Sequence, residues 1–262
     1  MTALVPAQLL SLALRQRLLP VLVHLLGSLL IALTAAGLVF GLWYPEPYRQ
    51  IAGGQELFML LVTVDVVVGP LITLVVFDRR KPRTELRRDM AVVVLLQLAA
   101  LGYGIWTLAA ARPVHLVFEL DRFRVVHAID VPPELLPQAP ESLRTLPWTG
   151  PTPMSLRPFR SDKEKFEATM AALGGVSLAA RPDLWQDYEA GRVALLREAQ
   201  PLGRLRERFP AQASEIDSAV ARSGRPEPAL AWLPLAARKS FWTVLVDRSS
   251  AEIVGFLPID SF

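Results

Sequence analysis

The sequence predicts a membrane protein with a three-helix transmembrane N-terminal part and a C-terminal α+β periplasmic domain that contains a small antiparallel sheet. Three uninterrupted apolar stretches are each long enough to cross the hydrocarbon core of a bilayer as a helix. They span about residues 18–43, 57–77 and 90–111. Beyond them the apolar residues recur with the shorter periods of strands and amphipathic helices. The chain therefore divides into a membrane domain, residues 1–112, and a folded domain, residues 113–262.

The first apolar stretch, Leu18 to Trp43, contains His24 as its only ionisable side chain. A cleaved signal peptide has a shorter apolar region and a small-residue cleavage site, so we expect this stretch to remain as a transmembrane helix. The connection that follows it is rich in Pro and Gly, which is typical of a tight turn. The rings of Trp43, Tyr44 and Tyr48 suit a membrane–water interface.

The second stretch carries one charged side chain, Asp65, near its middle. A carboxylate at that depth costs roughly 2.5 to 3.5 kcal/mol on insertion scales, so we expect Asp65 to face protein or water. Gly69 and Thr73 follow on the same stripe of the helix, and small residues permit the close approach of another helix. Pro70 lacks an N–H and leaves the carbonyl of Val66 without its usual donor, which predicts a kink.

Polar side chains of the other two stretches fall at similar depths when each residue is given a rise of about 1.5 Å. Tyr103 and Thr34 come near the level of Asp65, while His24 and Gln97 lie together nearer the other end. Asp65 as a lock within this chain, and His24 as a snorkelling or neutral group, remain simpler alternatives. We predict a partner-binding stripe formed by Asp65, Gly69, Pro70, Thr73 and Tyr103.

The distribution of basic residues predicts the orientation of the helices. Residues 78–89 include six Lys or Arg, and Arg15 and Arg17 precede the first stretch. Lys and Arg are enriched on the cytoplasmic side of membrane proteins, so both segments are expected to be cytoplasmic. The turn at 44–56 and everything after Arg112 then lie on the opposite side, which is the periplasm for a bacterial inner membrane.

The periplasmic domain is expected to begin with strands. Alternating residues within 114–119, and again from Phe123, predict two strands around a turn at Asp121. Residues 132–158 contain eight prolines, which predicts an extended connector or a partner-binding arm.

Capping residues and apolar periodicity predict the rest of the domain. Ser161 and Glu164 form a capping box at the start of a helix, and Gly174 is placed to end it. Pro182 suits the first turn of another helix. The expected helices span about 161–173, 182–199 and 211–222, and two strands, 241–246 and 252–257, are expected to form a closing hairpin.

The sequence offers no recognisable catalytic chemistry. It contains no cysteine, which excludes disulfides, thiolate catalysis and cysteine metal sites. His115 and His127 have no third histidine outside the membrane, so no metal site is predicted. A P-loop, an HExxH motif and a complete dinucleotide fingerprint are all missing. We predict no catalytic residue, no cofactor, no enzyme activity and no nucleic acid partner.

Motifs between residues 43 and 123 carry a family resemblance. They include the runs 43–48 (WYPEPY), 53–58 (GGQELF), 69–73 (GPLIT), 100–104 (ALGYG), 111–114 (ARPV) and 117–123 (VFELDRF), together with Asp65, Phe77, Asp89 and Gln97. In combination these motifs resemble the TfpX/TfpZ family of type IV pilin accessory proteins. The resemblance covers most of the chain and is least specific from 132 to 230.

The resemblance implies an inner-membrane, chaperone-like partner of a cognate type IV major pilin that modulates pilin stability or assembly without catalysis. The stripe around Asp65 would then pack against the transmembrane helix of the pilin, and the periplasmic domain would contact the pilin head. A membrane-anchored periplasmic sensor or ligand-binding module is the alternative. A membrane enzyme or transporter is disfavoured, because three helices with one carboxylate make a poor pathway.

Overall fold

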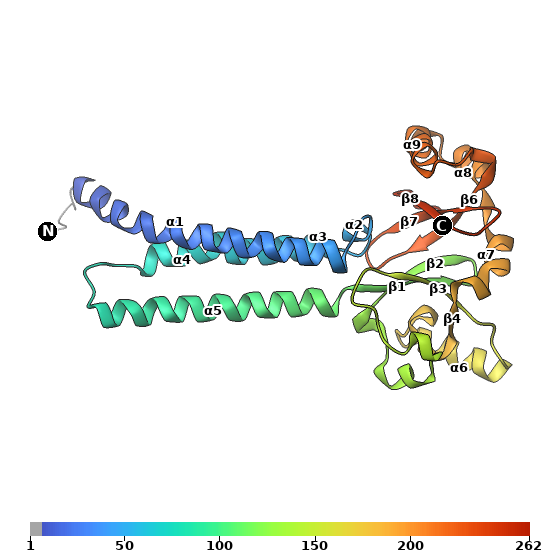
Figure 1. Cartoon of the computed structure of the whole chain (residues 1–262), viewed down its shortest axis with the longest axis horizontal. Helices are drawn as coiled ribbons and strands as arrows, with labels where there is room; N and C mark the ends of the chain where they lie inside the picture. The colour runs from blue at the N-terminus through green and yellow to red at the C-terminus, as the bar shows by residue number, and fades with distance from the viewer. Residues whose placement is uncertain (1–6) are drawn as a thin grey trace. The chain divides into compact units, whose positions relative to one another are not determined.

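The computed structural model describes residues 7–262 and divides the chain into two compact units (Figure 1). The first six residues of the predicted cytoplasmic arm lie outside the described residues. Three apolar helices make up the first unit, and the second combines helices with an open sheet. The predicted fold class is therefore confirmed.

Three helices of the first unit are long and apolar enough to cross a membrane. The first and second of them run side by side, and the third runs alongside in the same unit (Figure 1). The third begins earlier than expected because its basic first turns are also helical. The three are α1 (Ala7–Leu38) with the π-helix η1 (Val39–Trp43); α3 (Gly54–Val62), the π-helix η2 (Thr63–Val68) and α4 (Gly69–Val76); and α5 (Arg83–Ala110).

The disturbance that Pro70 predicts takes the form of the π-helix η2. The N–H of Gly69 donates to the carbonyl of Val64, five residues back, instead of to the residue four back. Pro70 cannot donate, and its ring crowds the preceding turn, so the helix widens there rather than continuing with regular α geometry. This wider turn carries Asp65.

The connection between the first two apolar helices folds as part of the second unit, which comprises Leu42–Gly54 and Ala110–Phe262. It contains the short helix α2 (Tyr48–Ile51). Tyr44 and Ile51 are fully buried there. Gly54 is required beside Tyr44, because a Cβ atom at that position would overlap the tyrosine ring. The expected boundary at residue 112 assigns this connection to the membrane domain, whereas in the structure it belongs to the second unit.

Trp43, Tyr44 and Tyr48, which are expected at a membrane interface, are covered by other residues of the chain. All three are less than a tenth exposed within the second unit. The ring of Tyr48 packs edge-on against Phe256 at 5.6 Å.

The second unit is built on an eight-stranded sheet with the order β4-β3-β1-β2-β6-β7-β8, and β5 also pairs with β6. The predicted first hairpin, β1 with β2, and the closing hairpin, β7 with β8, are both present. The pairs β1/β3 and β2/β6 are parallel, so the sheet is larger than expected and mixed. The strands are β1 (Pro113–Glu119), β2 (Arg122–His127), β3 (Thr152–Leu156), β4 (Trp185–Asp187), β5 (Gln200–Pro201), β6 (Leu230–Ala236), β7 (Phe241–Asp247) and β8 (Ile253–Leu257).

The proline-rich segment 132–158 is folded into the domain. It contains two 3-10 helices, η4 (Pro133–Gln138) and η5 (Glu141–Leu143), and ends in β3, an interior strand of the sheet. Trp148 lies 6.4 Å from Trp43 between ring centroids, and the Arg112 guanidinium lies over its ring at 4.4 Å. The segment is thus an ordered part of the sheet rather than a separate arm.

The predicted helices are only partly correct. Ser161 caps α6 (Asp162–Leu173) by accepting the Glu164 N–H at 3.1 Å, as the capping box predicts, and α9 (Ala213–Ser223) is also confirmed. The expected helix over 182–199 is wrong in its first half, where β4 lies between the 3-10 helices η7 (Pro182–Leu184) and η8 (Tyr188–Gly191). Only α7 (Arg192–Glu198) is α-helical. The helix α8 (Leu202–Arg208) was not anticipated.

Candidate functional site

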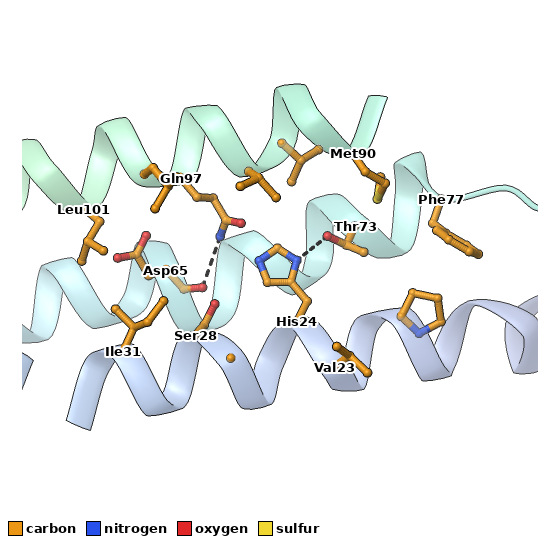
Figure 2. Close-up of a pocket in the computed structure, with 15 residues that line it drawn as sticks. Val23, His24, Ser28, Ile31, Asp65, Thr73, Phe77, Met90, Gln97 and Leu101 are labelled. Atoms are coloured by element: carbon orange, nitrogen blue, oxygen red, sulfur yellow. Dashed lines mark hydrogen bonds between the residues drawn. The ribbon is translucent and has the colours of Figure 1, made fainter. Parts of the chain in front are cut away.

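Asp65 lies on η2 and forms part of the walls of two cavities in the helical unit. The larger cavity, of about 440 Å³, is lined from α1, η2, α4 and α5 (Figure 2). The smaller, of about 230 Å³, is lined from α3, η2 and α5. Asp65 is only 6% exposed, and it lines both cavities. The widened turn of η2 thus holds a carboxylate between α5 and the rest of the unit.

Polar contacts cross the larger cavity from three helices. His24 Nδ1 and Thr73 Oγ1 are 2.5 Å apart, which joins α1 to α4. Gln97 Nε2, from α5, donates to the backbone carbonyl of Asp65 at 3.4 Å. Figure 2 shows both contacts beside apolar side chains such as Ile31. Apart from these groups and Ser28, every side chain that lines the larger cavity is apolar.

The carboxylate of Asp65 makes no hydrogen bond with any described residue. Both of its oxygens are buried and without a donor. In Figure 2 the carboxylate points away from His24 and Thr73. A buried carboxylate without a donor is costly in an apolar environment. We refer to the two cavities together as the groove. Asp65, which lines both of them, is an unsatisfied hydrogen-bond acceptor at the point where they meet.

The other predicted stripe residues fall into two groups. A Cβ atom at Gly69 would overlap the amide of Gln97, and Pro70 and Thr73 are buried, so these positions contact other helices of this chain. Tyr103 is 69% exposed and lines the smaller cavity together with Asp65. The structure therefore brings Asp65 and Tyr103 together in the walls of the smaller cavity, and the role of all five stripe residues in partner binding stays a prediction.

The two expected polar levels are only partly reproduced. His24 and Gln97 line the larger cavity together, as their depths indicate. Thr34 lines neither cavity and instead donates to the carbonyl of Leu30 at 2.9 Å.

The apolar walls of the groove were not predicted from the sequence. On α5 they extend from Met90 in the larger cavity to Thr107 in the smaller. These 18 residues correspond to roughly 26 Å of helix, nearly the thickness of a bilayer core. Leucines and valines line the groove and also face lipid, so residue type does not distinguish the two positions. The rotation of each helix about its own axis decides which of them face the groove, and the sequence does not give that rotation.

The histidines of the second unit have structural surroundings. His115 is 2% exposed, its Nδ1 lies 2.7 Å from Thr152 Oγ1, and its ring packs edge-on against Trp185 at 4.8 Å. Burial lowers the pKa of His115 to about 4. His127 Nδ1 lies 3.2 Å from a carboxylate oxygen of Asp130. No group of three His, Cys, Asp or Glu side chains in the described part of the chain is placed to hold a metal ion.

Known proteins resemble the chain over nearly its whole length. The family described as Fimbrial assembly protein FimB matches residues 12–53. Two fimbrial assembly proteins of Dichelobacter nodosus, of serogroups E1 and I, are 33% identical over 242 residues, which is 92% of this chain and 94% of each relative. A third, of serogroups C1 and C2, is 41% identical over 117 residues, which is 45% of this chain and 89% of that relative. No solved structure matches.

Proposed function

Because the chain belongs to the family of fimbrial assembly proteins, we propose that it acts in fimbrial assembly by binding a fimbrial subunit within the membrane. The finer proposal is an inner-membrane accessory protein of the TfpX/TfpZ type. It would be a chaperone-like partner of one cognate type IV major pilin and would modulate the stability or assembly of that pilin without catalysis.

The groove of the helical unit is the observation that carries this proposal. Its walls are apolar along roughly 26 Å of α5, a length that suits another transmembrane helix. A lipid chain would fill the apolar space but has no donor for the Asp65 carboxylate at that depth. A helix can provide both an apolar surface and a polar side chain, so we assign the groove to the transmembrane helix of the fimbrial subunit.

The division into units supports a periplasmic second unit. Residues 42–54 and 110–262 form one compact body, so both lie on the same side of a bilayer that the helices cross. Segment 78–89 connects α4 to α5 on the other side and carries six basic residues. The positive-inside rule then favours a cytoplasmic 78–89 segment and a periplasmic second unit beside the exposed part of the subunit.

Site-specific photocrosslinking in cells tests the proposal. A photoreactive phenylalanine analogue at Tyr103 or Leu98 lines the smaller or the larger cavity. Both are expected to capture the fimbrial subunit of the same organism. The matched control is Val75, which is 75% exposed on α4 and lines neither cavity, and it is expected to capture much less.

Two results would contradict this function. One is a subunit that crosslinks to neither cavity position while the altered proteins are present at normal levels. The other is a deletion strain in which subunit level and fimbriation are unchanged. Ligand-dependent stabilisation of the purified chain would instead support the alternative, a membrane-anchored sensor or ligand-binding module.

A further inference from the structure

We propose that the Asp65 carboxylate accepts a hydrogen bond from an N–H or O–H donor near the middle of the helix that occupies the groove. This inference rests on the proposed function, since it states what the bound helix must provide. Two observations carry it: the burial of Asp65 without a donor, and its place in the walls of both cavities.

Gln97 and His24, two polar neighbours of Asp65 in the larger cavity, make their hydrogen bonds elsewhere. The Gln97 amide donates to the backbone carbonyl of Asp65 and not to its carboxylate. His24 Nδ1 is engaged with Thr73 across α1 and α4. A partner helix that lies along the groove, by contrast, passes directly beside Asp65, because Asp65 lines both cavities. The missing donor is therefore expected from the occupant of the groove.

The position of Asp65 sets the depth of that donor. Asp65 is 11 residues from Gly54 and 11 residues from Val76, the two ends of its membrane helix. With a rise of about 1.5 Å per residue, the carboxylate lies roughly 16 Å from either end. A partner helix that follows the groove must place its donor near the midpoint of its own apolar span.

Asp65 can either lack a donor in the free chain or hold helices of its own chain together. The two roles predict opposite effects of Asp65→Leu on the thermal stability of the chain without its partner. If the carboxylate lacks a donor, replacing it with leucine removes an uncompensated polar group and raises the thermal midpoint of the detergent-solubilised protein. If Asp65 locks helices of its own chain, the same substitution lowers that midpoint. The inference requires the first result together with weaker binding of the subunit.

The decisive measurement is the dissociation constant of the full chain and the fimbrial subunit, each labelled for energy transfer and placed together in lipid nanodiscs. We expect Asp65→Leu to raise the dissociation constant roughly 3- to 30-fold, the range for one hydrogen bond between membrane helices. The matched control is Thr63→Leu. Thr63 is also on η2, but it is exposed, lines neither cavity and donates to the Met59 carbonyl, so its loss is expected to leave binding unchanged.

Asp65→Asn identifies the kind of donor. Asparagine keeps a carbonyl acceptor but removes the charge, so it preserves binding to a neutral donor and loses binding to a cation. Either result supports the inference when Asp65→Leu binds weakly.

The outcomes separate this inference from the function on which it rests. If the wild-type chain binds no subunit, the proposed function fails. Equal binding by wild type and Asp65→Leu overturns this inference alone. A lower thermal midpoint for Asp65→Leu also overturns it, as does self-association of the chain that depends on Asp65, because the occupant would then be a second copy.

Discussion

At the scale of single residues, Asp65 could be singled out from the sequence because a charge inside an apolar stretch is rare and costly. The contacts that Gly69 and Thr73 make could not be predicted from the sequence. Their spacing places them on one face of a helix, but it does not say which helix that face meets. In the structure Gly69 lies against Gln97 and Thr73 against His24, so both positions contact this chain, and their role in partner binding stays a prediction.

His115 predicts a pH dependence of stability in the second unit. Its folded-state pKa of about 4 lies below the ordinary value of 6.5, so the folded state favours neutral His115. The stability associated with this group is complete above pH 6.5 and is lost as the pH falls from 6.5 to 4. We expect the free energy of unfolding to drop by about 2 to 3 kcal/mol between pH 7 and pH 4.5.

Urea titration of the detergent-solubilised chain at these two pH values measures the drop. The control is His115→Gln, which keeps a side-chain amide near Thr152 but does not titrate, and its drop should be much smaller. The paired carboxylates Glu164 and Asp247 have pKa values of about 2, so their contribution is lost only at lower pH. Equal drops in wild type and His115→Gln would contradict the assignment.

At the scale of elements, local signals located the hairpins and the capped helices, because each depends on neighbours in sequence. They failed where distant residues decide the structure. Trp185 suited an amphipathic helix, yet it is buried in the sheet, with Nε1 donating to the Ala179 carbonyl at 2.8 Å. The strand β3 contains Pro153, which argues against an interior strand, and the strand exists because β1 and β4 pair with it.

The connection 42–54 is expected to be a stabilising element of the second unit. Ile51 is completely buried within it, so Ile51→Ala removes apolar contacts and leaves a cavity. We expect a loss of about 2 to 5 kcal/mol in the free energy of unfolding of the second unit. The matched control is Ile129→Ala, whose side chain is 61% exposed in the same unit, with an expected change below about 0.5 kcal/mol.

Hydrogen exchange of the β7 and β8 amides in the full chain reports this change, because β8 carries Phe256, the neighbour of Tyr48 in the same connection. Similar protection in Ile51→Ala and wild type would show that 42–54 is a passive linker.

At the scale of the whole molecule, composition was sufficient to predict three apolar helices and a separate α+β domain. Length and hydropathy depend on few details, so these predictions survive errors in single elements. The allocation of residues 42–54 to the second unit could not be predicted. Their aromatic and small residues suit either an interface or a folded core, and only the presence of a surface to pack on decides between them.

The proposed topology predicts which positions are accessible from each side of the membrane. The chain contains no cysteine, so single cysteines can be introduced without removing native ones. Cysteines in place of the exposed residues Gln50 and Ile129 are expected to react with a membrane-impermeant maleimide added to intact spheroplasts. A cysteine in place of Arg80 is expected to react only after permeabilisation.

Labelling of position 80 in intact spheroplasts would reverse the assigned orientation. Labelling of positions 50 and 129 from different sides would contradict the common unit that contains them.

The π-helical turn η2 makes the placement of Asp65 depend on chain length as well as on side-chain identity. Its wider winding accommodates an additional residue compared with α geometry. Deleting a single valine of η2, such as Val67, would let this turn rewind as α-helix and would leave α3 and α4 on nearly the same faces, because the wide turn holds the residue that is lost. A one-codon deletion inside α4, which has no such wide turn, would instead rotate Asp65 by about 100° relative to the part of the helix beyond the deletion, so the site tolerates a shorter chain at η2 but not at α4.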